Sequence, residues 1–435
     1  MAKTADDFTT TPASIKTADL NSLSKEDLVD RIRQLEFHVN QLKNIIAKSN
    51  DQKVGKAKLK NRPFDWSKYN KRHVALKIAY LGWDYKGFVV QEDTNKTIEH
   101  ALFEALITAK LIENRETSNY HRCGRTDKGV SAFCQVISID LRTTQSSGIG
   151  VITNPTAAPT DNEKPEIDFA GILNRILPDE IRVLAWAPVQ PDFSARFDCN
   201  SRTYKYFFAK GDLNVEIMDL AAKKLVGTHD FRNLCKMDVG NGVISFIRHI
   251  DSAGVTVAND SDGYSMCTFT VVSKAFLWHQ IRCIMALLFM IGKGQEKPEI
   301  LDELFDIERN PCKPQYTMAS ELPLNLFDCS YTDLSWIYDS VEVEKLLSHY
   351  QQQWAEHSIK SFMLRSVIGS LKDHAPSLNN YQADILVSDY RRHTTYRPLL
   401  SRTTCGSLED RKEHFAKRRK LNKFLNSTEL VKEDN

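Results

Sequence analysis

The chain has 435 residues, of which 42% are hydrophobic and 26% charged, and its formal net charge at pH 7 is only +2. This composition is typical of a globular protein long enough for two cores, and it excludes collagen-like, wholly disordered and small disulfide-scaffold proteins. The most apolar run, residues 275–292, carries His279 and Arg282 in its middle, so we expect a buried helix there and no membrane span.

The first segments are predicted to be appendages. Residues 1–22 are rich in Thr, Ala and Asp and are expected to be disordered. Residues 51–72 are predicted to form a basic linker. Its positive charges either bind a polyanion such as RNA or simply belong to a solvated, flexible segment. Between them, residues 23–50 are predicted to form a helix, because apolar side chains recur at heptad spacing: Leu28, Ile32, Leu35, Val39, Leu42 and Ile46. That helix is either a coiled coil or an amphipathic helix packed on its own domain.

A first folded unit is predicted over residues 73–190. Apolar residues alternate over 74–80, which indicates a strand. A helix with Thr97 as its N-cap follows, and then a turn at Asp127 leads into a long strand over 130–141. Residues 143–165 are rich in Thr, Pro, Ser and Asn and are expected to be a mobile insertion.

A second unit is predicted over residues 191–331 from similar parts. The pattern predicts strands at 201–210, 244–258 and 264–276, and helices at 217–227 and 277–294. The expected fold class is therefore α+β: two similar mixed or antiparallel sheet units with helices on one face, flanking a central basic cleft.

The remaining residues, 332–435, are predicted to form a helical extension and a basic tail. A helical pattern covers 333–372. Seven Lys or Arg and one acid lie between positions 411 and 423, and the run Lys-Arg-Arg-Lys at 417–420 fits a nuclear import signal. We therefore expect a protein of the nucleus and cytoplasm.

Asp127 is the first candidate for chemistry. Asp-Lys-Gly is good turn chemistry by itself, because Gly129 can adopt a positive φ. A turn does not require the flanking cations Arg125 and Lys128, however. We expect these cations to hold the Asp127 carboxylate ionised at neutral pH, which would make it a nucleophile or base.

Arg282 is the second candidate. It lies in a helix otherwise made of apolar side chains, where an unpaired buried charge costs several kcal/mol. Either its guanidinium reaches solvent, or it pairs with Asp127 across the cleft between the two units. His279, one turn earlier, is interpreted as a packing or hydrogen-bonding residue.

The strand at 201–210 is the third candidate. Arg202, Tyr204, Tyr206 and Phe208 share one face by the period of two. Such a face either stacks flipped bases or simply forms sheet core, and the base-stacking interpretation applies best to Tyr204 beside Arg202.

Absent motifs narrow the chemistry further. The sequence has no P-loop, no dinucleotide-binding glycine motif and no His/Cys metal pattern, and its nine cysteines stand singly. We therefore expect no cofactor and no metal. A lone activated carboxylate then suggests covalent or acid–base chemistry at a sugar-like centre.

The ordered strings of the chain resemble those of the tRNA pseudouridine synthase A (TruA-like) family over residues 73–331. The most specific is RCGRTDKGVSA at 122–132, and it is accompanied by YKGFVVQ at 85–91, TIEHALFEAL at 97–106, LNRILPDEIRV at 173–183, FSARFDCNSRTYKY at 193–206, GTHDFRNLC at 227–235 and KAFLWHQIR at 274–282. The C-terminal strings are most similar to the eukaryotic branch that modifies tRNA positions 38 and 39.

The resemblance implies roles for individual residues. Asp127 takes the position of the catalytic aspartate, Tyr204 that of the tyrosine packing on the target base, and Arg282 that of the arginine pairing with the aspartate. Arg125 takes the position of a residue that helps to extrude the uridine. Lys128 and Arg202 are expected to contact substrate.

The chain also departs from the family pattern. Ser194 replaces a histidine, Phe88 replaces a tryptophan, and residues 317–331 differ from the bacterial form.

The resemblance implies a cofactor-independent isomerase that acts on tRNA as a homodimer, flipping the target uridine out of the RNA. One alternative is a non-catalytic tRNA-binding protein or chaperone with the same fold. Others are a synthase acting at other tRNA uridines and an aspartate-based hydrolase of a small nucleoside.

Overall fold

The structure is a computed structural model that describes residues 64–156, 165–237, 243, 245–258, 265–375, 396–414 and 416–417. The elements below all belong to the unit that begins at Asp65. The predicted disordered segment 1–22 and helix 23–50 lie outside the described residues. The predicted linker 51–72 is described from residue 64 onward, and its last residues already belong to the first strand.

The first half of the sheet is built around the two predicted strands, β1 (Asn70–Tyr80) and β3 (Ser131–Thr143), which pair antiparallel. β5 (Ile181–Pro188) and the short β4 (Val151–Ile152) pair with β1, and β2 (His121–Arg122) pairs with β3. β4 falls inside the predicted mobile insertion, so these two residues of that segment belong to the sheet.

Two helices cover this half. In α2 (Ile98–Thr108), Thr97 caps the N-terminus as predicted, since its hydroxyl accepts a hydrogen bond from the His100 amide. α2 buries one apolar stripe, and α3 (Phe169–Asn174) packs beside β5.

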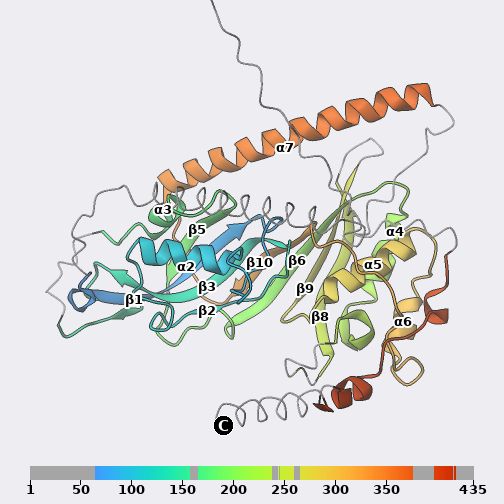
Figure 1. The fold of residues 1–435 in the computed structure, drawn as a ribbon, viewed down its shortest axis with the longest axis horizontal. Helices are drawn as coiled ribbons and strands as arrows, with labels where there is room; N and C mark the ends of the chain where they lie inside the picture. The colour runs from blue at the N-terminus through green and yellow to red at the C-terminus, as the bar shows by residue number, and fades with distance from the viewer. Residues whose placement is uncertain are drawn as a thin grey trace, which may run out of the picture. The chain divides into compact units, whose positions relative to one another are not determined.

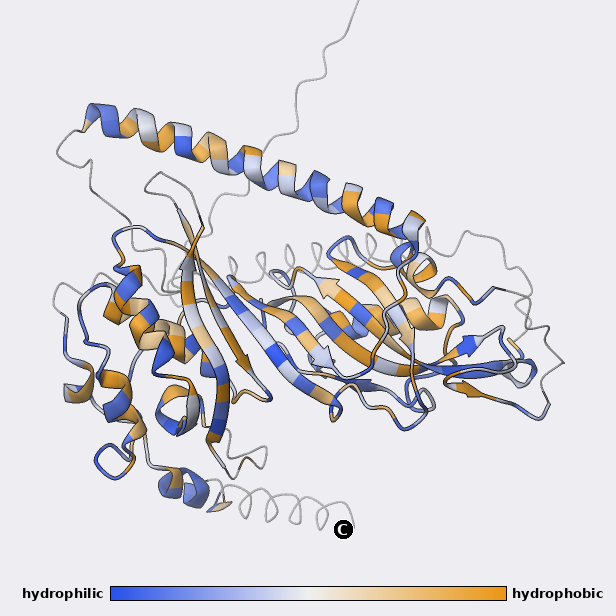
Figure 2. Ribbon diagram, turned by 180° about the vertical axis from the view of Figure 1, so that it is seen from behind, coloured by the Kyte–Doolittle hydropathy of each residue, from blue (hydrophilic) through white to orange (hydrophobic). Residues whose placement is uncertain are grey.

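The second half contains β6 (Cys199–Ala209), β9 (Met266–Ser273), β8 (Ile247–Val257) and β7 (Gly227–Asp230), which pair antiparallel in that order. Its helices are α4 (Val215–Lys223), α5 (Gln280–Gly292) and α6 (Ile300–Phe305). In Figures 1 and 2, α2, α4 and α5 lie on the same face of the strands.

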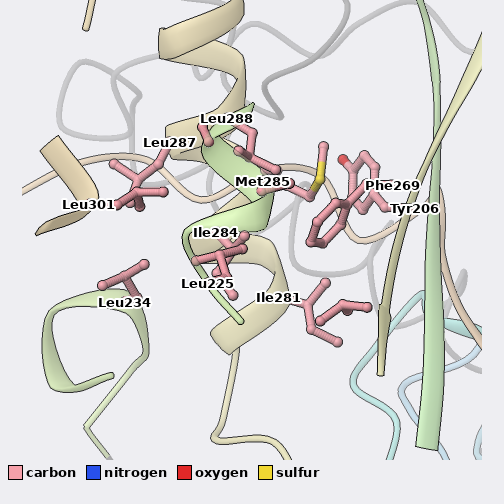
Figure 3. Close-up of a cluster of buried hydrophobic side chains, with 14 of the residues drawn as sticks. Tyr206, Leu225, Leu234, Phe269, Ile281, Ile284, Met285, Leu287, Leu288 and Leu301 are labelled. Atoms are coloured by element: carbon pink, nitrogen blue, oxygen red, sulfur yellow. The ribbon is translucent and has the colours of Figure 1, made fainter. Parts of the chain in front are cut away.

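α5 is the central core helix of the second half and confirms the buried helix expected there. Its side chains are buried nearly all round, because the sequence is apolar on every face. Figure 3 shows Met285 of α5 beside Phe269 and Tyr206 of the neighbouring strands, and Ile284 beside Leu225. Each such fully buried side chain contributes roughly 1.5–3 kcal/mol of transfer free energy.

The two halves are joined by β10 (Leu324–Tyr331), which the sequence analysis does not predict. β10 pairs parallel with β3 and antiparallel with β6. The expected two units are therefore halves of one mixed sheet, which has ten strands among the described residues. Eight follow the order β4-β1-β3-β10-β6-β9-β8-β7, while β2 pairs with β3 and β5 with β1 beside this path. Each half keeps its own hydrophobic core, and the α+β class is confirmed.

The helical extension is confirmed as α7 (Ser340–His374). Its N-terminal part is attached to the first half: the Asn174 amide donates to Glu342, and His349 hydrogen-bonds the Asp179 carbonyl. Farther along, large apolar side chains such as Trp354 and Phe362 are exposed, and Figure 2 shows hydrophobic and hydrophilic residues mixed along the helix.

Candidate active site

The loop between β2 and β3 carries Asp127 and is fixed by the segment after β1. The Val130 amide donates to the Asp127 carbonyl, which closes the turn, and Gly129 adopts φ +77° as the turn requires. The Phe88 amide donates to the Thr126 carbonyl, and the Thr126 hydroxyl lies 2.7 Å from that of Tyr80. The aspartate therefore stands on a braced turn at the start of a long strand.

The segment between β9 and α5 faces Asp127 from the second half. The indole Nε1 of Trp278 donates to Asp127 Oδ1 at 3.1 Å, and His279 Nε2 lies 3.5 Å from Asp127 Oδ2. Burial lowers the pKa of His279 to about 4, helped by the charges of Arg282 and Lys236. The imidazole is therefore neutral at neutral pH, in keeping with the hydrogen-bonding role expected for it.

Arg282 is buried at 9% exposure, so its guanidinium does not reach solvent. The expected ion pair with Asp127 is wrong, however. Arg282 Nη2 instead lies 2.8 Å from Glu321 Oε2, and its Nε donates to the Ala319 carbonyl at 2.8 Å. Glu321 comes from the loop before β10, the element that the sequence analysis does not predict.

Asp127 and Arg282 nevertheless line the same hollow of about 400 Å³, between the two halves of the sheet. Arg282 acts on the Asp127 carboxylate through space. A charge–charge interaction of this kind needs no contact distance. The arginine is thus shared between a direct partner, Glu321, and a more distant one, Asp127.

The charges that act on Asp127 differ from those expected. Burial raises the pKa of Asp127, opposed by the Trp278 hydrogen bond and by the charges of Arg282 and Lys236. The sequence neighbours Arg125 and Lys128 are exposed and form no ion pair with it among the described residues. Neither residue is among the leading causes of the shifted pKa of Asp127, although Arg125 lines the same hollow, so a role of the two cations in keeping the carboxylate ionised stays a prediction.

Lys236 stands over the Trp278 ring, with its Nζ 4.1 Å from the ring centroid, and its backbone amide donates to the Trp278 carbonyl. It thereby holds the indole that bonds Asp127. The sequence analysis misses Lys236, Trp278 and Glu321. For Trp278 a signal existed, since it directly precedes His279 in a matched string.

A second, larger hollow of about 640 Å³ adjoins the first and shares Arg125, Tyr204 and Phe276 with it. We call it the basic groove. Its lining carries five cationic side chains, which is the lining that a polyanionic backbone requires: Arg122, Arg125, Arg196, Arg202 and Lys274. Lys128 lines neither hollow, so the structure does not bring it to the site.

Tyr204 stands where the two hollows meet. Its ring is half-buried and packs edge-on against Phe276, with 5.2 Å between centroids. Burial raises the pKa of Tyr204 well above its usual value, so the phenol stays protonated. Tyr206 and Phe208, from the same strand face, are buried in the second core and form sheet core rather than a stacking surface.

Arg202 braces the groove from within. Its guanidinium donates to the carbonyls of Cys123, Arg196 and Lys274, at 2.8 Å for Cys123 and 3.2 Å for Arg196. These bonds tie β6 to the loop that carries Asp127 and to the end of β9. Arg202 therefore positions the groove as well as lining it.

Among the described residues, none of the helices combines the length and apolar character needed to cross a bilayer. The two described hollows instead present one half-buried carboxylate, one shared arginine, a protonated tyrosine and a cationic lining. This arrangement suits a nucleophilic or proton-transferring aspartate acting on a group that is delivered from a polyanion.

Comparisons with known proteins agree with this arrangement. A family model described as tRNA pseudouridine synthase matches residues 221–332. The tRNA pseudouridine(38/39) synthase of Homo sapiens is 48% identical over 433 residues, covering 93% of this chain and 90% of the relative. The enzyme of the same name from Saccharomyces cerevisiae is 39% identical and covers 74% of each chain.

A more distant relative, the tRNA pseudouridine synthase A of Methanosarcina mazei, is 30% identical over 298 residues, covering 68% of this chain and 98% of the relative. The similarity therefore covers more than two thirds of the chain even in this relative. The chain belongs to the tRNA pseudouridine synthase family.

Proposed function

We propose that the chain isomerises uridine to pseudouridine at positions 38 and 39, in the anticodon stem-loop of tRNA. The names of the human and yeast relatives support the two positions. The observation that carries the proposal is the position of Asp127 in a half-buried hollow that opens into the basic groove. RNA bound along the groove would deliver an everted base to the carboxylate.

Each residue of the two hollows has a separate role in the proposed reaction. Asp127, when ionised, attacks the nucleoside, and Trp278 holds one of its oxygens in place. Tyr204 offers its ring to the uracil and, because its phenol is protonated, can donate a hydrogen bond but cannot act as a base. Arg125, which is exposed and lines both hollows, is suited to replace the base as it leaves the stack. Arg282 provides positive charge at the hollow floor.

The reaction requires only rearrangement of bonds within the nucleotide. The N-glycosidic bond breaks, the uracil turns in the hollow, and C5 bonds to the ribose carbon. C5 loses one proton and N1 gains one, and the bond that Asp127 formed with the nucleoside breaks again to restore the free carboxylate. Atoms and electrons balance without an external oxidant or reductant. The 400 Å³ hollow lies within the size range of pockets that hold small ligands.

We further propose that the protein is a homodimer present in nucleus and cytoplasm. Exposed apolar side chains on α7, Trp354 and Phe362 among them, support a surface for a second copy. The basic run at 417–420 supports nuclear import. Light scattering of the full chain tests the first, and a fluorescent fusion with that run replaced by alanine tests the second.

The direct test uses the purified chain and an unmodified tRNA transcript with uridine at positions 38 and 39. We expect pseudouridine at these positions, and none at a position where cytidine replaces the uridine. Pseudouridine elsewhere in the transcript would contradict the positional assignment. Tight tRNA binding without any pseudouridine would favour a binding protein, and release of uracil from free uridine would favour a hydrolase.

A further inference from the structure

The first core contains a cluster of thiols that the proposed reaction does not use. Cys123 precedes the Asp127 loop, Cys199 opens β6, and Cys329 lies near the end of β10. Their sulfur atoms all lie within 4.8 Å of one another, and the Cys123 and Cys329 sulfurs are 3.3 Å apart. No two of them are close in sequence, so spacing motifs do not reveal the cluster.

We propose that Cys123, Cys199 and Cys329 form a binding site for one thiophilic metal ion, with Zn²⁺ as the expected occupant. Zinc bound to thiolates at about 2.3 Å in a tetrahedron places the sulfurs about 3.8 Å apart. The Cys123 and Cys329 sulfurs, 3.3 Å apart, lie about 0.5 Å inside that spacing, and no pair exceeds it by more than about 1 Å, so small side-chain rotations suffice to complete the geometry. All three thiols are at most 4% exposed, so they are held in place before any ion binds.

The surroundings meet the further requirements of a metal site. Three thiolates and Zn²⁺ carry a net charge of −1, and the Arg202 guanidinium beside them donates to the Cys123 carbonyl at 2.8 Å. Cys123 and Cys199 also line the basic groove. The groove therefore provides an entry path and a place from which water can supply the fourth ligand.

A disulfide between Cys123 and Cys329 fits the cluster less well. It would require the sulfurs to approach to about 2.05 Å, and it would leave Cys199 unpaired against it. Metal binding uses all three thiols. Each thiol loses its proton on binding, so occupancy releases up to three protons and tightens as the pH rises.

The site has a structural consequence. β10 and β6 are the strands at which the two halves of the sheet meet, and Cys123 is four residues before Asp127. An ion bound to these cysteines would join the catalytic loop to both strands. We therefore expect it to stabilise the fold and to hold the loop at the mouth of the groove. This inference does not depend on which uridines are modified.

The test measures the metal content of the full-length chain purified without chelators. We expect about one zinc per chain by elemental mass spectrometry, and less than about a tenth of that in Cys123→Ser, Cys199→Ser and Cys329→Ser. Cys267→Ser is the matched control, since Cys267 is equally buried but lies in the second core. It should keep its zinc.

Because a cysteine variant can misfold, the wild-type chain gives an independent readout. Removing the ion with a strong chelator should lower the melting temperature and make three further thiols reactive, and adding Zn²⁺ back should reverse both effects. Replacement by Co²⁺ should produce the intense visible absorption of tetrahedral cobalt thiolate. The proposal is overturned if the chain neither contains nor takes up zinc, if Cys267→Ser loses as much metal as the cluster variants, or if Cys123 and Cys329 form a reducible disulfide.

Discussion

The two adjoining hollows differ in what they offer a substrate. The Asp127 hollow has a mixed polar and apolar lining with one carboxylate, whose nearest contacts are Trp278 and His279. The basic groove is larger and is lined by five cations. Asp127 and Arg282 in the first each contact specific partners, whereas Arg125, Arg196 and Lys274 in the second are exposed to solvent. The contrast separates chemistry from binding, so substitutions in the two hollows should affect different kinetic parameters.

The largest effect is expected from Asp127→Asn. The amide keeps the shape and can still accept the Trp278 hydrogen bond, but it is no nucleophile. We expect kcat to fall by about 10³-fold or more, while the Kd for tRNA changes less than about threefold. Single-turnover kinetics and filter binding measure the two. Equal loss of both would mean that the hollows are not functionally separate.

A moderate effect is expected from the basic groove. Arg196→Ala and Lys274→Ala each remove a cation from its lining, and the Lys274 carbonyl that braces Arg202 remains. Each should weaken tRNA binding by about three- to tenfold and reduce the salt dependence of log Kd by about one unit. The value of kcat at saturating tRNA should stay at the wild-type level. An unchanged salt slope would mean that the groove does not contact phosphates.

Substitutions of Glu321 test whether the Arg282–Glu321 ion pair influences the pKa of Asp127. Its carboxylate pairs with Arg282 and contributes to raising the pKa of Asp127. Since Asp127 must be ionised to attack, activity falls as the pH drops through its pKa. Glu321→Gln should lower that pKa and move the acid limb of kcat/KM about 0.5–1 pH unit downward.

The matched control for this shift is Glu321→Asp. Aspartate keeps the negative charge, so the acid limb should stay near its wild-type position even if the overall rate falls. An acid limb that moves equally in both variants would show that packing over the turn, and not charge, governs the pH dependence. Packing is a possible cause because Glu321 lies close over the turn: a Cβ at Gly129 would lie only 2.7 Å from Glu321 Cγ.

The smallest effect is expected from replacing His279, and it concerns the pH dependence of the free energy of unfolding rather than activity. Its pKa is lowered to about 4 in the folded state, so between pH 6.5 and 4 the unfolded chain binds the proton more readily. The free energy of unfolding should therefore fall as the pH drops through that window. In His279→Asn, whose asparagine tolerates the positive φ of 58°, the fall from pH 7 to 5 should be smaller by about 1–2 kcal/mol. Urea denaturation at the two pH values measures it.

The sequence predicts elements whose pattern lies within one segment, and it misses elements that depend on contacts with residues far away in the chain. The period-two pattern of β1 and the apolar run of α5 are encoded within each segment, so both elements are found at nearly their observed positions. β10 is missed because its place is set by pairing with two strands far away in the chain. Its insertion turns two predicted sheets into one.

The site follows the same rule. The sequence analysis identifies Asp127 and Arg282 because each differs from its sequence neighbours: Asp127 is an acid between two cations in a turn, and Arg282 is a charge in an apolar helix. The partner of Arg282 is predicted wrongly because Glu321 reaches it through the loop before β10. The cations that flank Asp127 in sequence, Arg125 and Lys128, form no ion pair with it among the described residues. The cations that act on Asp127 come from the other half of the sheet.

The central claim is that Asp127 performs the isomerisation of uridines presented through the basic groove. The most direct measurement maps pseudouridine across tRNA from cells that lack this protein and are complemented with either the wild-type chain or Asp127→Asn at equal abundance. We predict that pseudouridine at positions 38 and 39 disappears without the protein, returns with the wild-type chain and stays absent with the variant. Restoration by the variant, or losses confined to other positions, would contradict the account.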